Sequence, residues 1–331
     1  MRCRAPRVLL IALAACTALV AVGVVFEQIS RWRAPRLFPP PGDLVEVGGK
    51  RTHLHCTGTG SPTVILEAGG GSPAAIWDSV QAGISDFTRV CSYDRAGYAW
   101  SDRRSGTRDA VRIADELHAL LQTASVPPPY VMVGHSLGGP LIAVYTHRYP
   151  NDVSGLVFVD PSLPEQAEWD SLDTSGAKQA ALIMVLRVAA RTGVLRLLQR
   201  YVDPPGMPPA FADDMRAFGA RNLSTVIRET DQFNEMLTQS DALTSFGNRP
   251  TIVLSAGRLP EEVLEERSGA YRALHDRFIE GHARYALRST NGEHRIVADA
   301  EHVIQWDNPD AVISAIVDVI TRARGMRPHG A

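Results

Sequence analysis

A five-residue turn at positions 134–138, with the sequence GHSLG, constrains this chain more than any other stretch. It follows the short apolar run Tyr130 to Val133, which predicts a buried strand. It leads into Leu137 to Tyr149, where apolar residues recur at helical spacing. A strand that passes so quickly into a helix must turn sharply, and the flanking glycines leave room for that turn. The pattern predicts a Ser136 hydroxyl raised at a sheet edge, at a helix N-terminus that favours negative charge.

Buried strands alternate with amphipathic helices on both sides of this turn, after a short hairpin at residues 44–56. This alternation predicts a mostly parallel sheet covered on both faces. The alternation stops after Asp160 and resumes at Pro250, and residues 161–248 contain only helix-like runs. The expected strands after the hairpin are 63–68, 89–93, 130–133, 155–159, 251–255 and 295–298.

In this setting the G-x-S-x-G turn resembles the nucleophile elbow of the α/β-hydrolase family. The resemblance covers roughly residues 44–160 and 249–322. It implies an α/β-hydrolase core over residues 43–160 and 249–331, with a mostly parallel central sheet and helices on both faces. Residues 161–248 are then expected to form a helical cap insertion that shapes the acyl or alcohol pocket.

One stretch of the expected cap, Ala177 to Tyr201, is predicted to be a single long apolar helix. Arg187, Arg191, Arg196 and Arg200 recur in it at near-helical spacing and predict a basic stripe. In the first interpretation these arginines are solvated. In the alternative the helix lies on an anionic membrane surface and passes lipophilic substrate to the site.

A serine nucleophile needs a histidine base, which a carboxylate orients. In the family the chain order is serine, acid, histidine. His302 stands between the last strand and the last helix, and its setting resembles the family's histidine loop. His294 is the alternative base, although it is expected at the start of that strand.

Two positions compete for the role of the acid. No aspartate follows the strand at 251–255, where family members often place it, but Glu261 and Glu262 lie there. Asp160 ends the strand before the cap and resembles the arrangement in a smaller set of relatives that includes lipases. We therefore expect Asp160 to be the acid, with Glu261 or Glu262 as the alternative.

Fixed backbone donors must hold the oxyanion of such a reaction. The N–H of Leu137, directly after the serine, is the expected first donor. Alignment with the family's loop after strand 63–68 implies Gly70 as the second. The loop Asp94 to Tyr98 also resembles the family, and we expect it to brace the elbow. For His135, beside the serine, we expect a packing or substrate-shaping role.

The resemblance implies a serine carboxylic-ester hydrolase of the carboxylesterase or lipase type. Its partner is then a small-molecule ester with an apolar acyl or alcohol group. No cofactor is expected, and no metal, because the sequence lacks an H-E-x-x-H motif or a cysteine–histidine cluster. The formal net charge of −2 gives no reason to expect nucleic acid as a partner. An amidase, peptidase or cofactor-free peroxidase on the same fold, and a non-catalytic binding protein, remain alternatives.

The N-terminal residues 1–42 differ in character from the body. Val8 to Phe26 is an uncharged apolar run, long enough to cross a bilayer core, and a proline linker at 36–42 follows it. An uncleaved anchor, a cleaved signal peptide and a lipoprotein signal ending at Cys16 are the three interpretations. We favour the anchor, because the apolar run continues past Cys16. The body is then membrane-anchored, or secreted if the segment is cleaved, and extracytoplasmic in both cases.

Two cysteines, Cys56 and Cys91, lie in the body of the chain. In the family's sheet order their two strands are antiparallel neighbours, which brings facing Cα atoms within disulfide range. The resemblance therefore implies a Cys56–Cys91 disulfide, which suits an oxidising compartment. Two free buried thiols are the alternative.

Overall fold

Eight strands in one sheet form the framework of the protein. The structure is a computed structural model that describes residues 5–166, 176–199, 207–259 and 268–325. The strand order is β1-β2-β4-β3-β5-β6-β7-β8; β2 is antiparallel to both of its neighbours, and the other adjacent pairs are parallel. The mostly parallel sheet predicted from the sequence is therefore confirmed. The strands are β1 (Asp43–Val47), β2 (Lys50–Thr57), β3 (Thr63–Glu67), β4 (Val90–Tyr93), β5 (Tyr130–His135), β6 (Val153–Val159), β7 (Thr251–Ala256) and β8 (Gly292–Val297).

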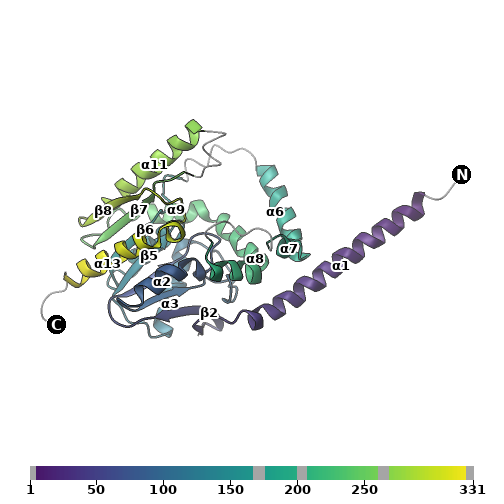
Figure 1. Ribbon diagram of the computed structural model, residues 1–331, viewed down its shortest axis with the longest axis horizontal. Coiled ribbons are helices and arrows are strands. Elements are labelled where there is room, and N and C mark those ends of the chain that lie inside the picture. The colour runs from purple at the N-terminus through teal and green to yellow at the C-terminus, as the bar shows by residue number, and fades with distance from the viewer. Residues whose placement is uncertain (1–4, 167–175, 200–206, 260–267, 326–331) are drawn as a thin grey trace.

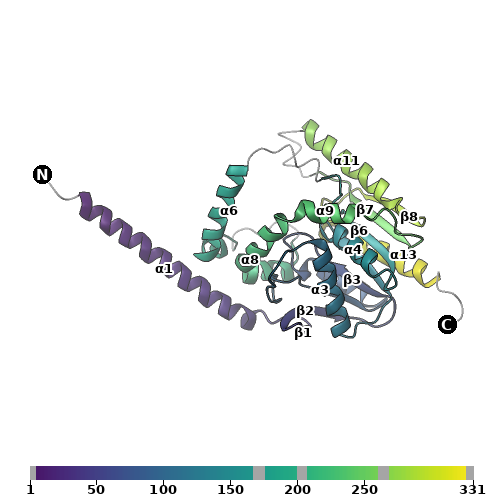
Figure 2. The same cartoon turned by 180° about the vertical axis from the view of Figure 1, so that it is seen from behind.

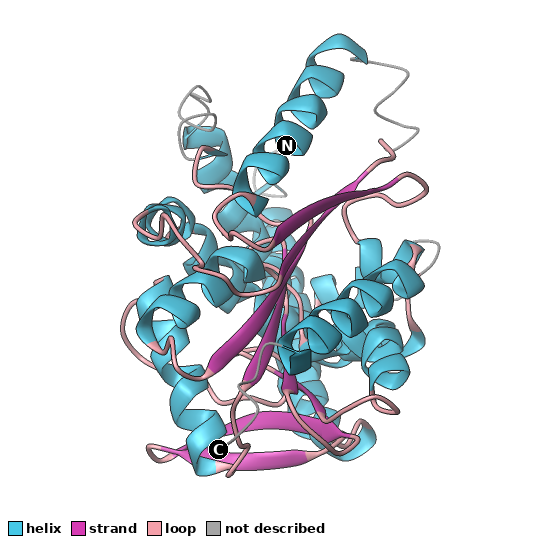
Figure 3. Cartoon of the chain, turned by 90° about the vertical axis from the view of Figure 1, so that its left-hand side faces the viewer, coloured by secondary structure: helices cyan, strands magenta, loops and turns pink. Residues whose placement is uncertain are grey.

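Helices cover both faces of this sheet, which is seen nearly edge-on in Figure 3. Alternate residues of the central strands enter opposite cores: Ile65 and Met132 pack on one face, Val64 and Val131 on the other. The first face carries α3 (Ala110–Thr123), α4 (Gly138–Arg148) and α11 (Ser268–Ala286). The second carries η1 (Ala74–Trp77), α2 (Asp78–Ile84), α12 (Ile304–Asp307) and α13 (Pro309–Gly325).

Between β6 and β7 the described chain contains a group of helices, which we call the cap. Its helices are α6 (Gly176–Arg191), α7 (Val194–Gln199), α8 (Pro209–Thr230) and α9 (Phe233–Asp241). The single helix predicted from Ala177 to Tyr201 is wrong, because Gly193 adopts a φ of 73° and separates α6 from α7. Arg187 and Arg191 are exposed, as the solvated stripe requires, but the expectation is wrong for Arg196, which is buried against Glu27; Arg200 lies outside the described residues.

The N-terminal helix α1 (Ala5–Leu37) projects away from the sheet in Figures 1 and 2. Its stretch Leu10–Leu37 reaches a mean hydropathy of 2.4 and is almost entirely exposed, so it could cross a membrane by length and composition. A signal sequence would pass the same criterion. The helix continues beyond the predicted apolar run, and Glu27 near its end accepts hydrogen bonds from Arg31 and from Arg196 of α7. That end of α1 is therefore fixed to the cap.

Cys56 and Cys91 face each other across the antiparallel pair β2 and β4. The two residues are joined by a disulfide with an S–S distance of 2.06 Å. This bond ties the antiparallel β2 to the parallel part of the sheet.

Candidate active site

Ser136 lies at the turn between β5 and α4, in a left-handed conformation with φ of 50°. This conformation is unusual for a residue with a side chain and marks a strained turn. A Cβ added at Gly134 would lie only 2.4 Å from the carbonyl oxygen of Gly138. A Cβ added at Gly138 would lie only 2.5 Å from the carbonyl oxygen of Glu67. The two glycines therefore permit the close packing that exposes the Ser136 side chain at the carboxyl end of the sheet.

A histidine and an aspartate meet beside this turn. Asp160 directly follows β6, and His302 lies between β8 and α12. His302 Nδ1 is 2.7 Å from Asp160 Oδ2, and the other carboxylate oxygen accepts a hydrogen bond of 2.9 Å from the Ala256 amide. Because Nδ1 donates to the carboxylate, Nε2 of a neutral His302 is left as a proton acceptor.

The electrostatic setting keeps this aspartate ionised. Burial acts to raise the pKa of Asp160, but the hydrogen bond and charge of His302, with smaller contributions from His282 and the Ala256 amide, leave that pKa below its usual value. The His302 side chain, by contrast, is 57% exposed and opens onto a cavity. An ionised carboxylate behind an accessible imidazole is the arrangement that orients a histidine for proton transfer.

Ser136, Asp160 and His302 line one cavity of about 400 Å³, which we call the Ser136 cavity. Most of its remaining wall is apolar or aromatic, and the cap contributes to it through Phe233. The other apolar or aromatic lining residues are Pro161, Ala256, Leu259, Tyr271, Leu274 and Phe278. Its described charged groups include Arg258 and Glu301, which lie 3.4 Å apart as an ion pair. The cavity therefore suits an apolar group better than a charged one.

A second cavity of about 560 Å³ meets the first at Ser136 and is more polar. It is lined by Gly70 and Leu137, the two expected oxyanion donors, and by cap residues that include Glu229 and Asn234. A Cβ at Gly70 would lie 3.5 Å from Leu137 Cδ2, so the Gly70 backbone lies close to the Leu137 side chain. Both expected donors thus belong to residues that line the same cavity as Ser136.

Arg95, in the loop after β4, holds the segment that leads to Gly70. Its guanidinium donates to the carbonyl oxygens of Ala68 at 2.6 Å and Gly69 at 2.8 Å. It also pairs with Glu67 of β3 and Glu229 of the cap helix α8, and all three charged side chains are buried. The contacts of Arg95 in the loop that we expected to brace the elbow are therefore with the segment that leads to Gly70 and with the cap.

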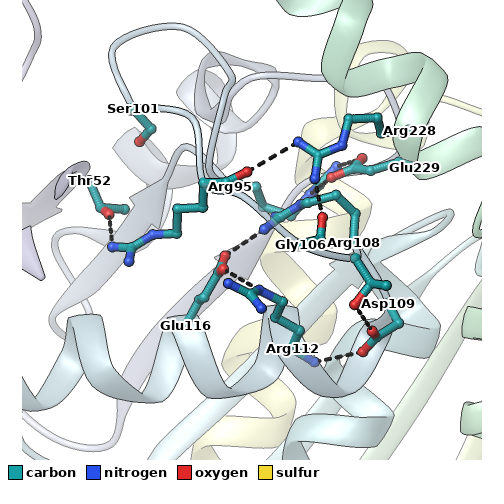
Figure 4. A network of polar contacts seen from close by, with 12 residues as sticks. Thr52, Arg95, Ser101, Gly106, Arg108, Asp109, Arg112, Glu116, Arg228 and Glu229 are labelled. Atoms are coloured by element: carbon teal, nitrogen blue, oxygen red, sulfur yellow. Dashed lines mark hydrogen bonds and ion pairs between the residues drawn. The ribbon is translucent and has the colours of Figure 1, made fainter. Parts of the chain in front are cut away.

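The same cap helix is attached to the core at a second point. Figure 4 shows Arg228 bonded to the Gly106 carbonyl, beside the ion pairs of Glu116 with Arg108 and Arg112. Arg228 also donates to the Arg104 carbonyl at 3.2 Å. Neighbouring residues of α8 thus hold two different parts of the connection between β4 and α3.

Two buried histidines that the sequence left without a specific role contact the proposed acid and base. His135 Nε2 lies 2.9 Å from the backbone oxygen of His302 and donates to it. Burial, with the nearby His302, lowers the pKa of His135 to about 3. His282 Nδ1 lies 3.8 Å from Asp160 Oδ1 and 2.7 Å from the Ser255 hydroxyl. Neither spacing nor periodicity could have signalled these contacts, which depend on the fold.

The remaining candidate residues lie elsewhere. His294 is in β8, with Nε2 2.7 Å from the Ser255 hydroxyl, and it is not among the residues that line the Ser136 cavity. Glu261 and Glu262 lie outside the described residues. Within the described ranges, no group of three or more histidine, cysteine, aspartate or glutamate side chains is arranged to hold a metal ion.

Comparison with known proteins places this chain in a family. A family model described as alpha/beta hydrolase fold matches residues 62–309. The chain belongs to the alpha/beta hydrolase family. This α/β-hydrolase is 26% identical over 296 residues to the 2-hydroxy-6-oxononadienedioate/2-hydroxy-6-oxononatrienedioate hydrolase of Escherichia coli O81 (strain ED1a), covering 84% of the chain and 94% of that protein. A hydrolytic role is supported by the family and by such relatives.

Two further similarities are more limited. This α/β-hydrolase is 36% identical over 125 residues to Probable transporter efuK of Hormonema carpetanum, a match that covers 35% of the chain and only 18% of that protein. The solved structure of a thermophilic esterase from Thermogutta terrifontis has a TM-score of 0.58 at 18% identity, covering 84% of this chain and 97% of the other. At that identity the similarity shows the fold alone.

Proposed function

We propose that this α/β-hydrolase is a membrane-anchored serine hydrolase that cleaves a carboxylic ester through an acyl-enzyme intermediate. The observation that carries the proposal is the His302–Asp160 hydrogen bond of 2.7 Å, at a cavity that Ser136 also lines. Ser136 is the nucleophile, His302 the general base and Asp160 the acid that orients it. Leu137 and Gly70 supply the backbone donors for the oxyanion.

The reaction proceeds in two halves. His302 Nε2 takes the hydroxyl proton as Ser136 Oγ bonds to the ester carbonyl carbon, and the carbonyl oxygen becomes an oxyanion. The bond from carbon to the leaving oxygen then breaks, and the imidazolium returns its proton to that oxygen to release the alcohol. Water then deacylates the enzyme: His302 takes one of its protons as the water oxygen bonds to the acyl carbon. The bond from that carbon to Ser136 Oγ breaks, the imidazolium returns the proton to Oγ, and the carboxylic acid leaves.

The walls of the two cavities support an apolar ester as the substrate. The Ser136 cavity offers aromatic and aliphatic side chains, whereas the polar cavity beside Gly70 carries the cap's Glu229, Thr230 and Asp231. We assign the apolar part of the substrate to the Ser136 cavity and the more polar part to the second cavity. A diacid of the kind named for the Escherichia coli relative would need cationic partners, and Arg258 already pairs with Glu301.

A fluorophosphonate probe and a substrate panel test the proposal together. We expect the probe to label the wild type and not Ser136→Ala, because the label requires an activated serine hydroxyl. Nitrophenyl esters of increasing acyl length are expected to be cleaved much faster than matched anilides. An inert Ser136 would favour a non-catalytic binding protein, and faster anilide cleavage an amidase or peptidase. Faster cleavage of a vinylogous diketo acid would favour carbon–carbon bond hydrolysis, as the relative's name suggests.

We further propose that α1 anchors the enzyme in a membrane. Its apolar stretch is exposed, and the ion pair between Glu27 and Arg196 fixes its end to the cap. The full-length chain is then expected to stay with membranes after carbonate washing and to be released by detergent. Release by carbonate alone, or recovery of a chain that begins after residue 26, would contradict the anchor.

A further inference from the structure

A third cavity, of about 260 Å³, lies apart from the two that meet at Ser136 and shares no lining residue with them. It is enclosed by the end of α1 and the linker after it, by β2, by the start of α2 and by the beginning of cap helix α8. Because carboxyl groups gather in its wall, we call it the acidic cavity. The proposed ester hydrolysis makes no use of it.

The carboxyl groups of this cavity are unequally paired. Asp213 pairs with Arg216 at 3.1 Å, so its charge is compensated at the rim. Asp214, at the next position of α8, is 3% exposed, and its Oδ2 has no hydrogen-bond partner among the described residues. Asp78 also lines the cavity, and no lysine or arginine is among the described lining residues. Two carboxyl groups therefore face this space without a cationic partner in the described part of the chain.

Histidines in the wall do not supply the missing cation. His53 lies 2.8 Å from Asp94 and is also bonded to the Pro41 carbonyl, so its charge is matched within that pair. Burial lowers the pKa of His55, which is therefore neutral near pH 7. Burial and the carboxylates of Asp94, Asp213 and Asp78 raise the pKa of Asp214 to about 9. The Asp214 carboxyl thus holds a proton near neutral pH, and a cation could displace that proton.

The rest of the wall limits what that cation can be. Phe38 and Trp100 contribute apolar surface, and no group of three metal-ligating side chains occurs among the described residues. A volume of about 260 Å³ is below the roughly 300–1,000 Å³ of cavities that hold drug-sized ligands, so the ligand is small. A buried carboxyl oxygen needs a hydrogen-bond donor, which a primary ammonium has and a quaternary ammonium lacks.

We propose that the acidic cavity is a binding site for a small primary alkylammonium ion. The ammonium group donates to Asp214 and is attracted by Asp78, and the alkyl chain packs against Phe38 and Trp100. Binding releases the proton of Asp214 to solvent, so the affinity rises with pH. If each binding event releases one proton, the affinity for the ammonium ion rises about tenfold per pH unit at pH values below the Asp214 pKa of about 9.

Calorimetric titration of the full-length chain in a nonionic detergent tests this site, with butylammonium as the probe. We expect saturable binding that butanol, butyrate and tetramethylammonium do not reproduce. Asp214→Asn keeps the shape of the protonated side chain but cannot take the charge, and we expect it to weaken butylammonium binding at least about tenfold. Asp78→Asn is expected to weaken binding by a smaller factor.

Asp213→Asn is the matched control, because it removes the adjacent carboxylate, which Arg216 already compensates. We expect it to change the affinity less than about threefold, as for an exposed, paired charge. No saturable binding, equal losses in the Asp213 and Asp214 variants, or an affinity independent of pH would overturn the proposal. Ser136→Ala is expected to bind the probe as the wild type does, so the outcome does not depend on the hydrolase assignment.

The ammonium group could come from a free amine or from a phosphatidylethanolamine headgroup. Butylammonium titration in nanodiscs of phosphatidylethanolamine or phosphatidylcholine separates these sources. A lower apparent affinity for butylammonium in phosphatidylethanolamine nanodiscs than in phosphatidylcholine nanodiscs indicates that the headgroup competes for the acidic cavity. Equal affinities in the two kinds of nanodisc indicate that the natural ligand is a soluble amine, provided that Asp214→Asn abolishes binding in both.

Discussion

Arg95 of the core and Glu229 of the cap form a two-point ion pair, with Nε–Oε1 and Nη2–Oε2 distances of 3.0 and 2.9 Å. Burial raises the pKa of Glu67, the other carboxyl group beside Arg95. Burial also acts to raise the pKa of Glu229, but the charge and hydrogen bonds of Arg95 keep it below its usual value. Glu229 is therefore the main counter-charge of a guanidinium that holds the oxyanion loop. The cap in this way stabilises the position of a proposed oxyanion donor.

We predict that Glu229→Gln lowers kcat about tenfold and changes KM less than threefold. The loss is smaller than the roughly 10²–10³ found when an oxyanion donor is removed, because the Gly70 N–H is only misplaced. A trifluoromethyl ketone, which forms the oxyanion on binding, is expected to lose affinity in parallel. Ester kinetics and inhibition constants for the same variant measure both effects.

Arg228→Gln provides the control, since Arg228 lies on the same turn of α8 but bonds to the carbonyls of Arg104 and Gly106. We expect this variant to lower the melting temperature and to keep kcat within about twofold of the wild type. Equal kcat losses in the two variants would mean that Glu229 contributes only to cap attachment, and the positioning role would then be abandoned.

Asp160→Asn is predicted to lower kcat by roughly 10³–10⁴ with a small change in KM. The amide oxygen would stay with the Ala256 N–H, so the NH2 would face His302 Nδ1 and favour the wrong tautomer, and a neutral amide does not stabilise the imidazolium. The double substitution of Glu261 and Glu262 by glutamine is expected to leave kcat within about threefold. Single-turnover kinetics with a nitrophenyl ester measure the acylation step directly. A large loss in the glutamate double variant and a small one in Asp160→Asn would assign the acid to residues 261 and 262.

His135→Phe is predicted to lower kcat about tenfold, because it removes the N–H that holds the His302 backbone oxygen. The acid limb of the pH–rate profile is expected to keep its midpoint. His135, with its pKa lowered to about 3, is already neutral throughout the working range. A full profile of kcat/KM from pH 4 to 9 measures this, and a shifted midpoint would show that His135 itself titrates in the reaction.

The local features of the site could be predicted from sequence because their causes are local. Gly134 and Gly138 flank Ser136 closely enough for their missing side chains to define the turn. Strand periodicity and chain order located β6 and β8, whose ends carry Asp160 and His302. Likewise, the antiparallel register of Cys56 with Cys91 follows from a sheet order that the family resemblance supplies.

Contacts between distant parts of the chain could not be predicted in this way. Arg95 and Glu229 are 134 positions apart, and Arg196 is 169 positions from Glu27. Helical periodicity placed Arg196 in a solvated stripe, because periodicity reports which residues share a helix face but not what that face packs against. The helix break at Gly193 could not be predicted from periodicity either, because a glycine within an apolar run leaves the helical spacing of the other residues intact.

Asp214 leads to a prediction about stability that needs no ligand. Its pKa is about 9 in the folded protein and 3.8 when unperturbed, so between these values the folded chain holds a proton that the unfolded chain has released. Rising pH therefore favours unfolding, by up to about 1.4 kcal/mol per pH unit. Asp214→Asn lacks this proton, and its stability relative to the wild type should increase by up to about 4 kcal/mol from pH 5 to pH 8.

Melting temperatures of the two proteins over that pH range measure the effect, with Asp213→Asn as the control. Asp213 is half exposed and paired with Arg216, so its replacement should give a difference that changes little with pH. A constant difference for Asp214→Asn, or one that shrinks as the pH rises, would mean that the Asp214 carboxyl ionises in the ordinary range. The acidic cavity would then carry its full negative charge near neutral pH, and cation binding there would release no proton.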